Sequence, residues 1–267
     1  MIDLRLFRAP AFGASLLTIT LALFAAFGAF LFLAQYLQLV LGLSPIEAGL
    51  WTLPSSFGLI VGSVLAPLLV RWVNPSVAIA GGMVVAAVGF GVLTQVDETS
   101  GLALAVFGSV VFALGVAPVI LATDLVVSTA PPQRAGAASA LAETSSEFGG
   151  ALGIAVLGSI GTAVYRGEVT DNVPAGVPPE AATTATDTIE GAVAVADDLP
   201  DQLGAELLEA ARAAFTQGFR LTAAIAAALA LGVAILVARL LRGVQPSSDH
   251  EPESEPEQSL VAAPQRQ

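Results

Sequence analysis

Cysteine and lysine are missing from this sequence, histidine occurs once, and charge of either sign is scarce. Without cysteine the chain has no disulfide and no thiol chemistry. The one histidine, His250, has neither a cysteine nor a second histidine to complete a zinc site. No nucleophile–base pair stands out, so we expect neither an enzyme nor a bound cofactor or metal. No basic patch suggests nucleic acid as a partner.

Charged residues make up only 12% of the 267 positions, and 55% are hydrophobic. A soluble domain averages about 25% charged residues. Uncharged runs of about 18 or more residues are typical of transmembrane helices, and such runs fill most of the chain. The sequence therefore predicts an all-α integral membrane protein in the lipid bilayer. We expect six spans at about 12–41, 46–70, 76–96, 101–129, 134–164 and 216–241.

The arginines indicate how these spans are oriented. Six of them fall on one side of the bilayer if the spans alternate, and that side is cytoplasmic by the positive-inside rule. They are Arg5, Arg8, Arg71, Arg134, Arg239 and Arg242. We therefore expect a multi-pass protein of the bacterial cytoplasmic membrane, with a short segment at 1–11 and both termini in the cytoplasm.

Most of the net charge of −12 lies in two polar segments. Ten acids and two arginines give residues 166–218 a charge of −8, and residues 243–267 carry −4. We expect 165–215 to be an extracytoplasmic loop with short amphipathic helices, either a cap on the helix ends or a lid that gates the outer mouth. The Pro- and Ser-rich tail at 243–267, which contains His250, is typical of a disordered segment.

Glu143 and Glu147 are the only charges in the 31-residue run from Ala135 to Tyr165. Four residues apart, they share a helix face. They lie roughly 13 and 19 Å beyond Arg134, near mid-membrane, where a charged acid costs roughly 2.5–3.5 kcal/mol. A site where a proton competes with an arriving cation is the simplest device for proton–cation exchange. The alternative is a buried protonated pair that hydrogen-bonds to Ser or Thr on neighbouring helices.

Asp124 is a third acid inside a predicted span, near its cytoplasmic end. A carboxylate there opposes the helix dipole, so it should have a partner. Arg134 follows ten residues later across the turn "STAPPQRAG". We expect an ion pair that holds the inner face closed, with direct proton handling by Asp124 as the alternative.

The string "LSPIEAGL" opens the second span with a helix-capping pattern. Ser44 and Glu47 have capping-box spacing, and Pro45 suits the first helical position. Capping explains Glu47 without transport chemistry, although a role in substrate entry stays open. Trp51 is either an interface anchor or a residue facing the substrate cavity.

Polar side chains also cluster near the outer end of the first span. Gln35 and Gln38 flank Tyr36. Polar groups facing lipid are costly, so these residues should line a substrate cavity or pack against other helices.

Small residues recur four positions apart in the second and fifth spans, at Gly58, Gly62 and Ala66 and at Gly149 and Gly153. This spacing lets membrane helices approach closely.

Three strings resemble one transporter family. They are "IDLRLFRAPAFG", "LGLSPIEAGLWTLPSSFGLIVGSVLAPLLVRWV" and "ATDLVVSTAPPQRAGAASALAETSSEFGGALGIAVLGSIGTAVYRGEV". Together they are similar to the C-terminal half of the drug:proton antiporters of the major facilitator superfamily with fourteen spans, the QacA-type multidrug and antiseptic efflux pumps. The resemblance extends to about Arg242.

The resemblance implies export of lipophilic cations driven by proton entry, with acids inside the helices as coupling and cation-binding groups. Glu143, Glu147 and Asp124 match that pattern. The family's N-terminal motifs have no counterpart here, so we expect a missing N-terminal half or a second copy of the chain as partner. The alternative is a non-transporting remnant or a membrane module that associates with a full-length pump.

Overall fold

The computed structural model describes residues 10–97 and 101–240. The predicted tail with His250 and nearly all of the segment at 1–11 lie outside the described residues. Within the described part the chain is helical and contains no strand. Its elements are α1 (Pro10–Gln35), a π-helical turn (Tyr36–Val40), α2 (Pro45–Leu69), α3 (Pro75–Leu93), α4 (Gly101–Val116), a 3₁₀ turn (Ala117–Val119), α5 (Ile120–Thr129), a 3₁₀ turn (Pro132–Arg134), α6 (Ala135–Asn172), α7 (Pro179–Asp187), α8 (Ile189–Ala196) and α9 (Asp201–Leu240).

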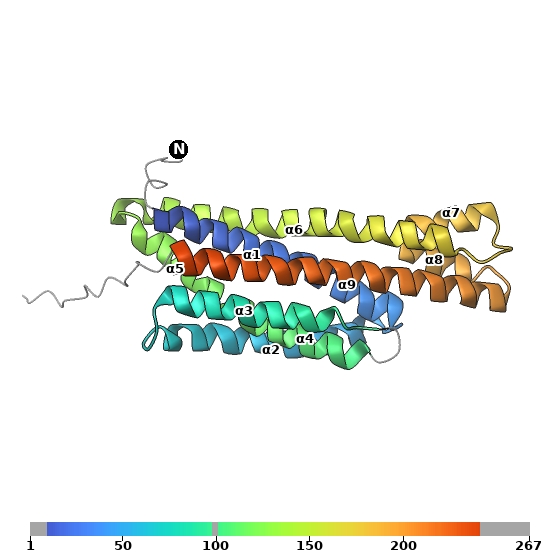
Figure 1. The fold of residues 1–267 in the computed structure, drawn as a ribbon, viewed down its shortest axis with the longest axis horizontal. Coiled ribbons are helices and arrows are strands. Elements are labelled where there is room, and N and C mark those ends of the chain that lie inside the picture. The colour runs from blue at the N-terminus through green and yellow to red at the C-terminus, as the bar shows by residue number, and fades with distance from the viewer. Residues whose placement is uncertain (1–9, 98–100, 241–267) are drawn as a thin grey trace, which may run out of the picture.

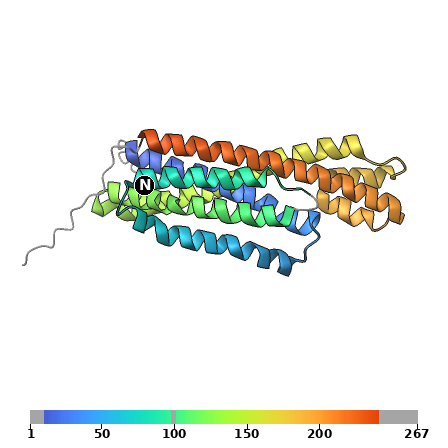
Figure 2. The same cartoon turned by 60° about the horizontal axis from the view of Figure 1, so that its bottom comes forward.

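Six helical stretches in this part of the chain are long and apolar enough to cross a membrane. They run side by side in an elongated bundle, which confirms the predicted all-α membrane fold (Figure 1). One end of the bundle carries Arg71, Arg134 and Arg239, and we call it the arginine end. The other end carries α7, α8 and the start of α9, and we call it the loop end (Figure 2).

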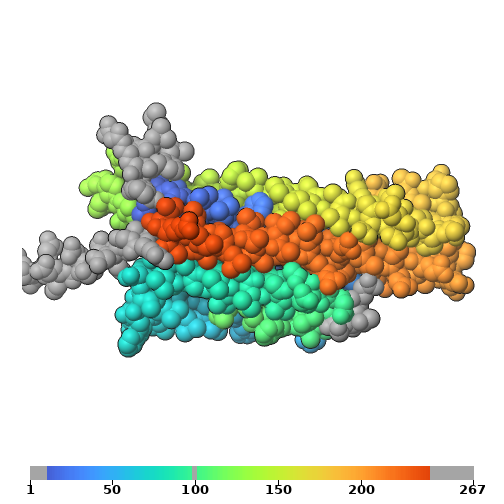
Figure 3. Space-filling model, viewed as in Figure 1, coloured from blue at the N-terminus to red at the C-terminus, as the bar shows by residue number. Residues whose placement is uncertain are grey.

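Two helices are longer than the sequence pattern predicts. The fifth span was expected to end at 164, but α6 continues to Asn172; the last was expected to start at 216, but α9 begins at Asp201. No proline interrupts either helix, so the polar turns extend the apolar ones without a break. The predicted amphipathic segment is therefore the first part of α9. Both helices project past α3 and α4 at the loop end (Figure 3).

Close helix packing depends on the small residues that the sequence singled out. A methyl group at Gly149 or Gly153 of α6 would collide with the backbone of Thr20 or Phe24 in α1. In α2, a Cβ atom at Gly58 would lie 2.8 Å from the carbonyl oxygen of Val110 in α4. Both predicted patterns are thus confirmed as sites of close backbone approach.

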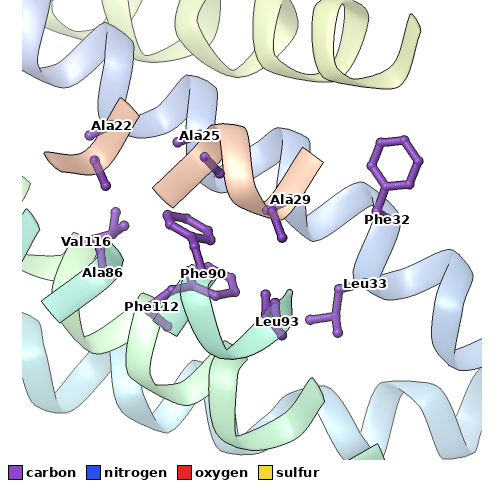
Figure 4. Packing of buried hydrophobic residues seen from close by; sticks show 14 of the residues in the cluster. Ala22, Ala25, Ala29, Phe32, Leu33, Ala86, Phe90, Leu93, Phe112 and Val116 are labelled. Carbon is purple, nitrogen blue, oxygen red and sulfur yellow. The ribbon is translucent and has the colours of Figure 1, made fainter. Parts of the chain in front are cut away.

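The centre of the bundle is filled by alanine and aromatic side chains. Ala22, Ala25 and Ala29 of α1 are buried beside Phe90 of α3 and Phe112 of α4 (Figure 4). The rings of Phe90 and Phe112 stack with their centroids 4.8 Å apart. Because the alanines are small, α1 lies close to its neighbours along this stretch, and the six spans pack as one body.

At the loop end, α7 and α8 pack against the ends of α6 and α9. The hydroxyl of Tyr165 in α6 donates a hydrogen bond of 2.7 Å to the carbonyl oxygen of Ala185 in α7. Arg212 of α9 donates to the carbonyl oxygen of Leu39 at 3.2 Å. Short helices in this loop were predicted and are present; whether they act as a cap or a gating lid stays a prediction.

Candidate functional site

The helices α2 and α6 are the least covered spans of the bundle. Only 22% of the most apolar stretch of the α2 span and 33% of that of the α6 span is buried, against 61% for the span made by α4 and α5. Large apolar side chains on α6, among them Phe148, Leu152 and Ile154, are exposed. Such apolar faces in a membrane protein contact lipid or another protein body.

Glu143 and Glu147 lie on the exposed part of α6. Neither carboxylate has a hydrogen-bond or ion-pair partner among the described residues. The neighbouring hydroxyl of Thr144 donates back to its own helix, to the carbonyl oxygen of Ala140 at 2.8 Å. The alternative of a buried pair hydrogen-bonded to neighbouring Ser or Thr residues is therefore not what the structure contains.

The surface that carries Glu147 continues along α6 toward the loop end. Ala151, Ile154, Gly158 and Thr162 follow Glu147 at helical spacing, so they form one stripe on the helix. We call these five residues the α6 stripe. At about 1.5 Å per residue, the stripe extends roughly 22 Å along α6, from Glu147 to Thr162.

A second stripe on α1 runs beside it. A Cβ atom at Gly150 would lie 3.3 Å from the ring of Phe27, and one at Gly158 would lie 3.8 Å from Leu31. Phe27, Leu31 and Gln35 share one side of α1 at helical spacing, and Phe27 is 49% exposed. The two stripes together form a surface with the carboxylate of Glu147 at one end and the amide of Gln35 at the other.

Asp124 is exposed on α5. No ion pair joins it to Arg134 in the part of the chain that the structure describes. The expected closing role of this pair therefore stays a prediction. The same holds for direct proton handling by Asp124.

The three polar residues near the outer end of the first span have different surroundings in the structure. Tyr36 is fully buried in the π-helical turn, and its hydroxyl donates to the carbonyl oxygen of Asp97. Tyr36 is thus a packing residue, and the expectation that it lines an accessible cavity is wrong. Gln38 donates to the carbonyl oxygen of Ala34 in its own helix at 3.1 Å. Gln35 donates to Glu190 of α8 at 3.3 Å, so it reaches the loop helices.

Ser44, Glu47 and Trp51 lie in the first turns of α2. Ser44 and Glu47 form the predicted capping box, in which each side chain accepts a hydrogen bond from the other residue's backbone N–H. Trp51 is 44% exposed and lies with Phe107 along an apolar groove between α2 and α4. Its exposure is compatible with both predicted roles, interface anchor and cavity wall.

Sequence reasoning missed Phe27 and Glu190 as companions of the predicted site. An aromatic residue in a long apolar run gives no signal of its own, and Glu190 is one of ten acids between residues 166 and 218. Only the packing of α1 against α6 and the hydrogen bond between Gln35 and Glu190 distinguish them from their neighbours.

Comparison with known proteins identifies the family. The family model of the Major Facilitator Superfamily matches residues 3–154, more than half of the chain. The chain therefore belongs to the Major Facilitator Superfamily, which classes it with transport proteins and not with enzymes.

Two relatives have names that describe export. The chain is 39% identical over 226 residues to the multidrug efflux pump LfrA of Mycolicibacterium smegmatis, covering 84% of this chain and 44% of that protein. It is 32% identical over 231 residues to the tetracenomycin C resistance and export protein of Streptomyces glaucescens, covering 84% and 43%. The chain thus spans less than half the length of these relatives.

A solved structure supports the fold. A bacterial homologue of the human lysosomal transporter Spinster, in an inward-facing and unoccupied conformation, matches with a TM-score of 0.62 at 18% identity. The match covers 92% of this chain and 51% of that one. At this identity the likeness concerns the fold alone.

Proposed function

We propose that this chain is the C-terminal six-helix half of a proton-coupled exporter of lipophilic cations, of the fourteen-span QacA type. The names of the relatives, a multidrug efflux pump and an antibiotic export protein, support drug export. The resemblance of the α6 string supports the subtype and the half.

The observation that carries the proposal is the pair of exposed carboxylates, Glu143 and Glu147, on an apolar helix face. A carboxylate without a partner in a membrane span is costly unless it is protonated, faces water or binds a cation. A proton and a cationic drug would therefore compete for this site, and that competition couples their movements in opposite directions.

A second body is part of the proposal, because one half supplies one wall of a transport cavity. Alternating access in transporters of this kind comes from rocking one half against another around a central site. The exposed faces of α2 and α6 are suited to contact such a body. We propose that it is a missing N-terminal half or a second copy of this chain.

The charge distribution supports a proposal for the membrane and the orientation. Arg71, Arg134 and Arg239 lie at the arginine end, and the acidic segment lies at the loop end. Because short loops rich in arginine stay in the cytoplasm, we propose that the arginine end faces the cytoplasm of a bacterium and that the loop end faces outward.

Coupled transport by purified protein in liposomes tests the proposal. The 267-residue chain is reconstituted alone, and the flux of a fluorescent lipophilic cation is followed under an imposed pH gradient. Glu143→Gln keeps the size of the side chain but removes its exchangeable charge, and Glu180→Gln makes the same change on α7 at the loop end. We expect flux in the wild type and in Glu180→Gln, and loss of flux in Glu143→Gln.

The remaining outcomes separate the alternatives. Equal flux in all three proteins would refute the coupling role of Glu143. No flux from folded wild-type chain, with flux restored by co-reconstituting a complementary N-terminal half, would identify the missing half as the partner. No flux in either arrangement would leave the second candidate, a non-transporting remnant or a module of a full-length pump.

A further inference from the structure

A cavity of about 140 Å³ lies at the loop end, where α1, α6, α8 and α9 meet. Its walls include Phe32 of α1, Tyr165 of α6 and Phe215 of α9. Gly158 and Thr162, the last two residues of the α6 stripe, also line it. The cavity therefore opens at the end of the surface that begins at Glu147.

Aromatic rings form the inner wall of the cavity. Phe32 and Phe215 are buried, with ring centroids 5.7 Å apart and planes inclined by 41°. Tyr165 is held in place by its hydrogen bond to Ala185. Because three rings on three different helices are fixed by packing, the shape of this wall does not depend on a bound ligand. Aromatic faces attract organic cations through the negative potential of their π-systems.

Two carboxylate residues, Asp187 and Glu190, also line the cavity. Asp187 lies 3.5 Å from the guanidinium of Arg166, so its charge is offset. Glu190 accepts a hydrogen bond from the neutral amide of Gln35, at 3.3 Å. No arginine is among the described residues that line the cavity. The charge of Glu190 is therefore not neutralised by a cationic side chain of the described residues, and the surrounding segment of residues 166–218 carries −8.

We propose that this loop-end cavity binds the quaternary ammonium head group of an organic cation, with Phe32, Tyr165 and Phe215 around the methyl groups and Glu190 as counter-ion. A trimethylammonium group has four non-hydrogen atoms. A cavity of about 150 Å³ in another protein holds benzene, which has six, so the head group fits the available volume. A quaternary ammonium group has no N–H to donate. Aromatic rings and one carboxylate, Glu190, therefore suit it better than a site made of hydrogen-bond acceptors would.

The site is distinct from the carboxylates at mid-span. Along α6, Gly158 lies 11 residues beyond Glu147, or roughly 16 Å. Binding in the cavity does not depend on transport. A role of the cavity as an intermediate binding site for a cation that leaves through the loop end does rest on the proposed function. A negative outer segment raises the local concentration of cations near such a site.

Binding of choline to the purified 267-residue chain tests the site, in a maltoside detergent so that no choline head group is present. Saturation-transfer NMR on the choline methyl signal and calorimetry both report binding. We expect a Kd on the order of 1 mM. The neutral analogue 3,3-dimethylbutan-1-ol has the same shape without the charge, and we expect it to bind about tenfold more weakly. Absence of saturable choline binding, or equal binding of the two probes, would overturn the proposal.

Variants locate the bound cation. Glu190→Gln should weaken choline binding by about fivefold or more, whereas Glu180→Gln, the same charge change outside the cavity, should leave it within about twofold. Gly158→Leu should weaken binding by filling the cavity, because Gly158 lines it and a Cβ atom there would lie 3.8 Å from Leu31, in ordinary contact and without a clash. Thermal unfolding confirms that each variant is folded. Equal losses in both glutamine variants, or no loss in Glu190→Gln and Gly158→Leu, would contradict the assignment.

The two proposals fail separately. Flux that depends on Glu143 with no choline binding would overturn the cavity site and leave the transport proposal intact. Choline binding that depends on Glu190, without flux from the chain alone or together with a complementary N-terminal half, would do the reverse.

Discussion

At the scale of single residues, the charged side chains of this protein differ in how the surrounding structure satisfies them. Glu143 and Glu147 lie in a membrane span without a partner among the described residues. Arg212 and Arg220 of α9, in contrast, donate to backbone carbonyl oxygens at the ends of other spans, those of Leu39 and Thr94. The carboxylates are therefore available for chemistry, and these two arginines have a structural role.

The half-buried Arg212 should stabilise the fold more than the exposed Arg166 does. Arg212 donates a hydrogen bond to the carbonyl oxygen of Leu39 at the end of the first span. That oxygen has no partner within its own helix. We expect Arg212→Ala to lower the free energy of unfolding by about 1.5–3 kcal/mol, because a charged hydrogen bond is lost. Arg166→Ala removes an exposed ion pair with Asp187 and an exposed hydrogen bond to the carbonyl oxygen of the same residue, and should cost about 0–1 kcal/mol because both contacts are open to solvent. Denaturation of both variants in detergent measures the difference in unfolding free energy. Equal losses in the two variants would argue against a stabilising role of the hydrogen bond between Arg212 and Leu39.

At the scale of elements, α6 has two faces with opposite properties. Gly149 and Gly153 allow α1 to approach on one side, and the α6 stripe with the carboxylate of Glu147 lies largely exposed on the other. The helix must therefore pack tightly to α1 while it keeps a surface open for a ligand or a second body. Small residues on the packed side meet both demands, because they add contact without adding volume.

Two alanine substitutions on α6 should have effects of opposite sign. A methyl group at Gly153 would collide with the carbonyl oxygen of Phe24, so Gly153→Ala should destabilise the bundle by about 1–3 kcal/mol. A methyl group at Gly167 would meet no other atom within 4 Å, so Gly167→Ala should stabilise the helix by about 0.5–1 kcal/mol. Thermal unfolding compares them. Loss of stability in both variants would contradict the expected gain in helix stability from a methyl group at Gly167.

At the scale of the whole molecule, the bundle is polar at its two ends in different ways. The arginine end carries the basic residues of the short connections, and the loop end carries the acidic segment. The exposed faces of α2 and α6 lie along the long axis between the two polar ends, which is the geometry that a second body beside this one requires.

The orientation of the bundle can be measured with single cysteines, because the chain has none of its own. Thr183 in α7 and Gln133 before α6 are exposed at opposite ends. In intact cells, a membrane-impermeant maleimide should label Thr183→Cys, while Gln133→Cys should react only after the membrane is permeabilised. The reverse pattern would place the arginine end outside and contradict the proposed direction of export.

Much of the architecture follows from the sequence alone. Six long apolar runs determine six membrane helices, because the backbone must satisfy its own hydrogen bonds in lipid. The capping box of Ser44 and Glu47 and the close approach at Gly149 and Gly153 also follow from the pattern. These features depend on neighbours along the chain or on repeats along one helix, and such relations are visible in one dimension.

The tertiary structure decided which side each polar residue faces. It buried Tyr36, joined Gln35 to Glu190 and left Glu143 and Glu147 exposed. It also assembled the loop-end cavity from α1, α6, α8 and α9. The sequence could not determine these facts, because in helices that are apolar all round the pattern does not mark which side packs. The choice depends on how distant segments fit together, and only the folded bundle fixes that fit.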